Sequence, residues 1–250
     1  MKFSYDYAAC SETGMKESNQ DRYLIGSDEE TGAVFCMVAD GIGGVAGGEA
    51  AADICRLLFS SWFRSDFRYI SRSEYFGMAL ADAWSDKIAM ADQICKQGAD
   101  FGGTTLTLLL LHGGSYYAAN VGDSRAYLMR DGELFQITKD HSWVQQQLDD
   151  GVEPETIQQS KLKNTITRCI GLDTGDINSN RPDFYTNDYG PGDMFLICTD
   201  GFRHKIRVSQ MVDFLKDCTG CSDKLNNITE YVLAAGETDN ITSCLIEVKA

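Results

Sequence analysis

Four aspartates stand where apolar, strand-like segments end or turn. Asp40 follows AVFCMVA, Asp123 follows YYAANVG, Asp200 follows MFLICT, and Asp239 precedes the last strand-like run. A carboxylate at the mouth of an apolar strand is costly unless something compensates its charge. Carboxylates and a backbone carbonyl beside glycine are ligands that Mg²⁺ and Mn²⁺ prefer, and the absence of histidine from these clusters argues against zinc. Together the four aspartates favour a site for hard divalent cations.

Two other interpretations of these residues are weaker. Any one aspartate could form a local turn with neighbouring N–H groups, but four such positions favour the cation site. The stretch from Gly41 to Ala46 also fits the G-x-G-x-x-A pattern of dinucleotide sites. In that case Asp40 would repel the pyrophosphate, and the strand–helix–strand repeat that should follow is missing.

Composition bounds the class of protein. The chain has 250 residues, 43% of them hydrophobic, and a net charge of −15, so it can bury a core and is not expected to bind nucleic acid or anionic membranes. The first ten residues lack the apolar region of a signal peptide, and the longest apolar run, Leu106 to Leu111, is too short to span a bilayer. We therefore expect a soluble, cytoplasmic protein.

Nine cysteines are scattered along the chain, and an odd number in an unsecreted protein favours reduced thiols. Cys218 and Cys221 have C-x-x-C spacing. Zinc would need a second such pair, and a redox motif would need a strand before it and a helix beginning at it. The pair is interpreted as structural or incidental.

The hydrophobic pattern predicts strands that do not alternate regularly with helices. This order disfavours a doubly wound parallel sheet and favours an α+β fold of antiparallel sheets covered by helix pairs. The polar segment Ser142 to Asp183 is expected to be a flap over the site, within a single domain of residues 1–250. The predicted strands are 3–10, 33–39, 104–111, 116–121, 125–130, 133–138, 193–199 and 241–248, and the predicted helices are 49–64, 73–97 with Ser73 as N-cap, 208–216 and 225–235.

Short motifs run through nearly the whole chain in one order, and together they are highly specific. They are KESNQD (16–21), VADGIGG (38–44) with Gly48-Glu49, GTT (103–105), ANVGDSRAY (119–127), TKDHS (138–142), TRCIG (167–171), CTDGF (198–202) and DNIT (239–242). With this set the sequence resembles the PPM (type 2C) family of metal-dependent protein serine/threonine phosphatases, in its bacterial form.

The resemblance implies a four-layer α/β/β/α sandwich with Mn²⁺ or Mg²⁺ in the cleft between the two sheets. Asp40 would bridge two ions, Asp200 and Asp239 would hold the first, and the Gly41 carbonyl the second. Asp21 would hydrogen-bond to metal-bound water. Asp123, with Asp200, would bind the weaker third ion of bacterial members.

The resemblance also implies hydrolysis of phosphoserine and phosphothreonine by direct attack of a hydroxide that bridges the metals. The expected partner is a phosphorylated protein substrate, with the chain opposing a serine/threonine kinase and acting as a monomer. The alternative is a pseudophosphatase, a regulatory domain that binds a phosphoprotein without turnover.

Some positions depart from the family pattern. Lys16 stands where arginine is usual, so it can neutralise a substrate phosphate but cannot form a bidentate contact. Gln20 replaces glutamate, and Ile42 replaces the histidine that serves as general acid in eukaryotic members. His141 could supply a proton, but it is expected instead to cap the turn into the flap helix.

Overall fold

The computed structural model describes residues 3–42, 47–98, 102–175, 178–217 and 219–249. Residues 43–46, which belong to the dinucleotide-like pattern, and Cys218 of the C-x-x-C pair lie outside the described residues.

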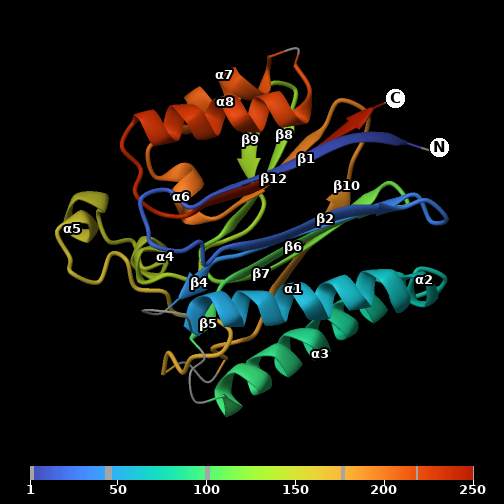
Figure 1. Cartoon of the computed structure of the whole chain (residues 1–250), viewed down its shortest axis with the longest axis horizontal. Coiled ribbons are helices and arrows are strands. Elements are labelled where there is room, and N and C mark those ends of the chain that lie inside the picture. The colour runs from blue at the N-terminus through green and yellow to red at the C-terminus, as the bar shows by residue number, and fades with distance from the viewer. Residues whose placement is uncertain (1–2, 43–46, 99–101, 176–177, 218, 250) are drawn as a thin grey trace.

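Two antiparallel sheets of five strands each lie face to face, and helices cover the outer face of each sheet (Figure 1). The first sheet has the order β1 (Ser4–Glu12), β12 (Ile241–Lys249), β11 (Met194–Cys198), β8 (Arg125–Arg130) and β9 (Glu133–Gln136). The second has the order β10 (Asp183–Asp188), β7 (Ser115–Val121), β6 (Leu106–His112), β3 (Ala33–Ala39) and β2 (Arg22–Asp28). A short pair, β4 (Gly41–Ile42) with β5 (Gly103–Thr104), extends past the end of β3.

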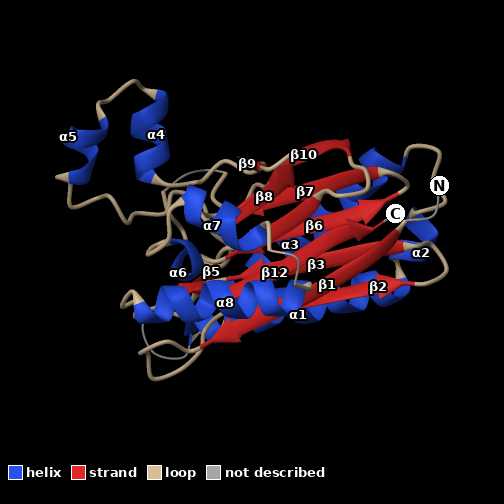
Figure 2. Ribbon diagram, turned by 90° about the horizontal axis from the view of Figure 1, so that it is seen from above, coloured by secondary structure: helices blue, strands red, loops and turns tan. Residues whose placement is uncertain are grey.

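The helices form the two outer layers and a projection at one end of the sandwich. The second sheet is covered by α1 (Gly47–Ser65) and α3 (Phe76–Gln97), which are joined through α2 (Phe67–Ile70). The first sheet is covered by α7 (Val208–Leu215) and α8 (Cys221–Ala234), with α6 (Asp200–Arg203) at its end. Seen from above, α4 (Trp143–Asp149) and α5 (Pro154–Gln158) project from one end of the sandwich (Figure 2).

Strand β3 shows why the sequence folds into layers. Successive side chains of a strand point to opposite faces of its sheet. Phe35 and Met37 pack toward the helices, whereas Cys36 and Val38 pack between the two sheets. Both faces of β3 are therefore buried, which explains its uninterrupted apolar sequence. The predicted α+β sandwich of two antiparallel sheets flanked by helices is confirmed.

Several predicted boundaries differ from the structure. Ser73 is not the N-cap of α3, because the helix begins at Phe76 after Tyr75, and the Ser73 hydroxyl instead accepts a hydrogen bond from the Tyr75 N–H at 3.2 Å. The expected start at 225 is also wrong, since α8 begins at Cys221. Strands β2 and β10 and the short helices α2 and α6 were not expected, and Asp183, expected to end the flap, is the first residue of β10.

Cys221 behaves as a buried structural residue, although a helix begins at it. Its N–H donates to Asp6 Oδ2 at 2.9 Å and its thiol donates to the Asp6 carbonyl at 3.4 Å. Burial raises the pKa of the Cys221 thiol to about 12, so the thiolate needed for redox chemistry is not formed at neutral pH. Among the described residues, no helix is long and apolar enough to cross a bilayer.

Candidate metal centre

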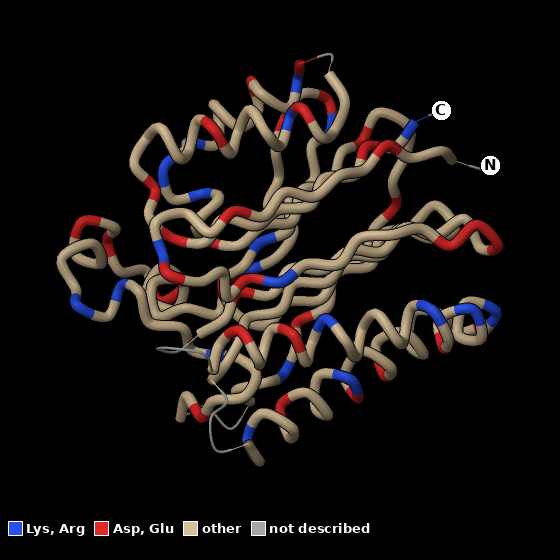
Figure 3. Tube along the Cα trace, viewed as in Figure 1, with Lys and Arg blue, Asp and Glu red and all other residues tan. Residues whose placement is uncertain are grey.

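The predicted ligands come from different strands that end on the same side of the sandwich. Asp40 directly follows β3, Asp200 begins α6 just after β11, Asp239 lies two residues before β12, and Asp21 directly precedes β2. Acidic and basic segments meet between the sheets at the end from which α4 and α5 project (Figure 3). The fold therefore brings together residues that lie up to 218 positions apart in the sequence.

Two close backbone contacts make this convergence possible. A Cβ atom on Gly201 would lie 2.1 Å from the Asn240 carbonyl oxygen, so no other residue fits between α6 and the start of β12. A Cβ atom on Gly41 would lie 2.6 Å from the Gly48 carbonyl carbon. Both glycines follow predicted ligands. Their lack of a side chain lets α6 approach the start of β12 and lets β4 approach the start of α1.

The main chain of Asp40 is fixed by the β5–β6 segment. Its N–H donates to Thr105 Oγ1 at 3.0 Å, and its carbonyl accepts from the Thr105 N–H at 2.9 Å. The Thr105 hydroxyl in turn lies 2.7 Å from the Ser124 hydroxyl, next to Asp123. These bonds fix the direction in which the Asp40 carboxylate leaves the chain.

Burial and crowding raise the pKa of the Asp40 carboxyl well above its usual range. Burial is the largest cause, followed by the negative charges of Asp21, Asp200, Asp123 and Asp239. Carboxylates whose charges act on one another in this way repel unless a proton or a cation lies between them. Five convergent carboxylates therefore fit hard divalent cations with oxygen ligands.

Asp21 is almost completely buried, with 3% of its surface exposed. Its Oδ2 atom accepts a hydrogen bond of 2.9 Å from the Thr199 hydroxyl, while Oδ1 has no hydrogen-bond partner among the described residues. Burial raises the pKa of this carboxyl to about 7, against the lowering effect of hydrogen bonds from Thr242 and Thr199. A buried carboxylate oxygen without a partner suits a water bound to a cation.

Lys16 lies at the rim of the site. Its Nζ atom is 2.9 Å from Asp239 Oδ1, and half of its side chain is exposed. The hydrogen bond that Lys16 donates to Asp239, and then the charges of Asp239, Asp200 and Asp40, raise the pKa of Lys16. The predicted phosphate-binding group is therefore protonated and paired with a predicted metal ligand.

Sequence reasoning missed two residues that hold the Asp239 loop. The Asn240 side chain accepts from the Gln20 N–H at 2.9 Å and donates to the carbonyls of Thr13 and Ser18, so it anchors the loop that carries Lys16. Glu237 Oε1 accepts from the N–H groups of Thr238 and Asp239 at 2.8 and 2.9 Å. The position of Asn240 directly after a predicted ligand was the available signal.

A histidine does lie beside the cluster, contrary to the expectation from the sequence. His204 Nε2 is 3.4 Å from Asp200 Oδ2, and its Nδ1 is 3.6 Å from Glu237 Oε2. The i,i+4 spacing within CTDGFRH was the signal, because one helical turn brings such residues together.

His141 does not cap the flap helix. Ser142 is the N-cap of α4, and its hydroxyl accepts from the Gln145 N–H at 3.2 Å. His141 Nδ1 accepts from the Gly122 N–H at 3.1 Å, so Nε2 carries the proton and donates to Asp183 Oδ2 at 3.1 Å. Both ring nitrogens are thus engaged, and burial lowers the His141 pKa. This arrangement joins the β7 turn to β10 and disfavours a role as proton donor.

Asp123 lies beside two arginines. Arg203 Nη2 is 3.5 Å from Asp123 Oδ2, and Arg125 forms a two-point contact with the neighbouring Asp140 at 2.8 and 2.7 Å. Burial and the charge of Asp200 raise the pKa of Asp123 to about 6, although Arg203 acts in the opposite direction.

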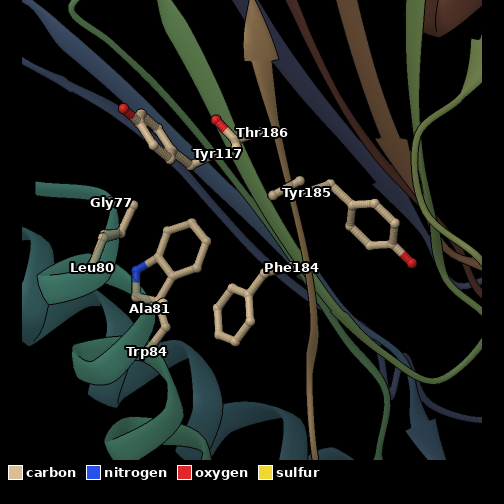
Figure 4. A pocket seen from close by; sticks show the side chains of 9 residues that line it. Gly77, Leu80, Ala81, Trp84, Tyr117, Phe184, Tyr185 and Thr186 are labelled. Carbon is tan, nitrogen blue, oxygen red and sulfur yellow. The ribbon is translucent and has the colours of Figure 1, made fainter.

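An apolar pocket of about 160 Å³ lies away from these carboxylates, between α3 and the strands β7 and β10 (Figure 4). Its walls include Leu80, Trp84, Tyr117 and Phe184. None of the predicted site residues lines it, so the pocket and the carboxylate cluster are separate features.

Comparison with known proteins identifies the family. The family model described as protein phosphatase 2C matches residues 11–232, and the chain belongs to this family. It is 30% identical over 248 residues to the serine/threonine protein phosphatase PstP of Mycobacterium tuberculosis, covering 97% of this chain but 45% of that protein. It is 29% identical over 241 residues to the protein phosphatase PhpP of Streptococcus pneumoniae, covering 95% of each.

A solved structure of the PstP catalytic domain, in complex with two manganese ions, superimposes with a TM-score of 0.81 at 26% identity. The match covers 99% of this chain and 100% of that domain. This chain thus spans about half the length of full PstP and corresponds to its catalytic part.

Proposed function

We propose that this chain hydrolyses phosphoserine and phosphothreonine in proteins, with Mn²⁺ or Mg²⁺ as cofactor. The observation that carries the proposal is the position of the Asp40 carboxylate. It directly follows the buried strand β3, and the negative charges of four other carboxylates raise its pKa. The two manganese ions in the PstP catalytic domain support the choice of cation.

Asp40, Asp200, Asp239 and the Gly41 carbonyl would hold two divalent cations, with Asp40 shared by both. Bound cations supply hydroxide at neutral pH and neutralise charge on the phosphoryl oxygens. Asp21, held through Oδ2 by Thr199, would orient a water with Oδ1, which no group in the described part of the chain engages.

Lys16 would bind the substrate phosphate from the rim. Its raised pKa keeps it positively charged, and its exposure leaves it accessible from solvent. Because an ammonium is a point charge rather than a planar fork, it would attract the phosphate without fixing its orientation. Ile42 carries no proton to donate, so the leaving oxygen would take its proton from solvent in the site.

We also propose how the domain is organised and where it acts in the cell. Residues 1–250 would act as a single catalytic domain and a monomer, with a flap of about 142–183 that shapes substrate access. The substrate would be a phosphorylated protein in the cytoplasm, and the chain would oppose a serine/threonine kinase.

Hydrolysis of p-nitrophenyl phosphate and of a phosphothreonine peptide, with and without Mn²⁺, tests this function. We expect turnover that requires Mn²⁺ and falls by about 10³-fold or more in Asp40→Asn. Asp213→Asn, at an exposed position of α7, is the matched control and should keep full activity. Turnover that is independent of Mn²⁺, or equal in Asp40→Asn, would refute the proposal.

The same experiment distinguishes an active phosphatase from a pseudophosphatase. A pseudophosphatase would bind the phosphothreonine peptide, measured by fluorescence anisotropy, without hydrolysing it at any Mn²⁺ concentration.

A further inference from the structure

Arg203 places a fixed positive charge inside the carboxylate cluster. It is the last residue of α6, the short helix that begins at Asp200, and only 15% of its side chain is exposed. Its Nη2 atom donates to the Asp123 carbonyl at 3.1 Å and lies 3.5 Å from Asp123 Oδ2. The guanidinium is therefore held against both the main chain and the side chain of Asp123.

Of the two nearby aspartates, Asp123 is the main ion-pair partner of Arg203. Arg203 Nη2 is also 3.9 Å from Asp140 Oδ2, but Asp140 is already bound at both oxygens by Arg125. Gln136 donates a further hydrogen bond to Asp140 Oδ1 at 3.1 Å. The two arginines and two aspartates thus form a network with no net charge, in which Arg203 is the cation for Asp123.

The Nε atom of Arg203 is buried and has no hydrogen-bond partner among the described residues. A buried donor without a partner is unfavourable, so other interactions must hold the side chain in place. Those are the contacts of Nη2 with Asp123 and, at longer range, with Asp140. Charge attraction rather than a complete set of hydrogen bonds keeps the guanidinium in the cluster.

We propose that the Arg203 guanidinium takes the place of a third cation beside Asp123, so that this chain works with two divalent ions. The inference rests on the proposed metal-dependent function and departs from the third ion that the family resemblance implies. A divalent cation bound by Asp123 and Asp200 would lie next to a guanidinium that cannot lose its proton. Repulsion between the two positive charges inside a largely buried cluster would exclude that cation.

Counting bound Mn²⁺ tests the inference without relying on activity. Metal-stripped protein is titrated with Mn²⁺, and free Mn²⁺ is measured by electron paramagnetic resonance. We expect two bound ions for the wild type. Arg203→Met, which keeps the aliphatic stem and removes the charge, should bind a third ion at least about tenfold more tightly than any third ion in the wild type.

Matched variants test whether the charge of Arg203 excludes the third ion and whether Asp123 binds it. Arg203→Lys keeps the positive charge and should bind two ions, and the double variant Arg203→Met with Asp123→Asn should also return to two. Arg203→Gln removes the charge but keeps a donor for the Asp123 carbonyl, so it replaces Arg203→Met if circular dichroism shows that the methionine variant is unfolded.

The outcomes separate this inference from the proposed function. Three ions in the wild type with the same affinities as in the neutral variants, or two ions in a folded neutral variant, would overturn the role of Arg203 and leave the two-ion function standing. No bound Mn²⁺ in the wild type and the neutral variants would overturn both.

Discussion

The ammonium of Lys16 lies 2.9 Å from the Asp239 carboxylate, so the group expected to bind substrate phosphate is paired with a group expected to bind metal. Both side chains are substantially exposed, and the pair can open when a cation or a phosphate arrives. We therefore expect substrate binding and metal binding at this edge of the site to be coupled.

Lys16→Met should separate the effect of Lys16 on substrate binding from its effect on metal binding. Loss of the charge–phosphate contact should raise the KM for p-nitrophenyl phosphate roughly tenfold, which corresponds to about 1.4 kcal/mol. Because Asp239 loses its ion-pair partner, the Mn²⁺ concentration needed for half-maximal activity should fall.

Lys16→Arg is the conservative partner of that variant and should lower KM through a bidentate phosphate contact. Steady-state kinetics at several Mn²⁺ concentrations measure both quantities. Unchanged KM and kcat in Lys16→Arg would contradict the phosphate-binding role of Lys16.

Asp21 should make the stability of the metal-free protein depend on pH. Its folded pKa of about 7 is above the ordinary value of 3.8, so its carboxyl favours the folded state below pH 4 and loses that contribution as pH rises through about 7. Urea denaturation in EDTA should therefore show a contribution on the order of 1 to 4 kcal/mol that disappears between pH 4 and 8.

Asp21→Asn cannot ionise, and the difference between its pH profile and that of the wild type isolates this group. Parallel profiles for the two proteins would show that burial of Asp21 does not shift its pKa.

Gly201→Ala should disrupt the site. The added Cβ would meet the Asn240 carbonyl oxygen at 2.1 Å, so α6 and the start of β12 must move apart. We expect a loss of about 2 kcal/mol or more in the free energy of unfolding and a loss of Mn²⁺-dependent activity.

Gly26→Ala in β2 is the matched control, because a Cβ at that position meets nothing within 4 Å. Its free energy of unfolding should stay within about 0.5 kcal/mol of the wild type. Equal denaturation midpoints for the two alanine variants would argue against the close approach at Gly201.

Mn²⁺ should stabilise the folded protein. At a concentration one hundred times its Kd, a bound ion adds about 2.7 kcal/mol, which corresponds to a rise in Tm of roughly 5 to 10 °C for a chain of this size. Differential scanning fluorimetry with Mn²⁺ and with EDTA measures the shift.

Asp200→Asn should abolish most of this rise, whereas Asp213→Asn on the outer surface of α7 should retain it. A full Tm shift in Asp200→Asn would remove Asp200 from the proposed ligands.

The sequence by itself determined the layered architecture and the identity of the acidic cluster. Apolar runs such as 33–39 must be buried on both faces, and aspartates placed where such runs end must meet a compensating charge. These are local properties, since strand period, turn residues and burial can be read within a few positions. Strand β2 was missed because its alternation is weak and one face is partly exposed.

Only the tertiary structure decided which side chains meet between elements. The pairing of Lys16 with Asp239, the support of Asp21 by Thr199, and the placement of Arg203 against Asp123 all join residues at least 80 positions apart. Such contacts depend on strand order and on backbone approaches such as that of Gly201 to Asn240, which no local pattern encodes. The charge balance of the site is therefore a property of the packed sandwich.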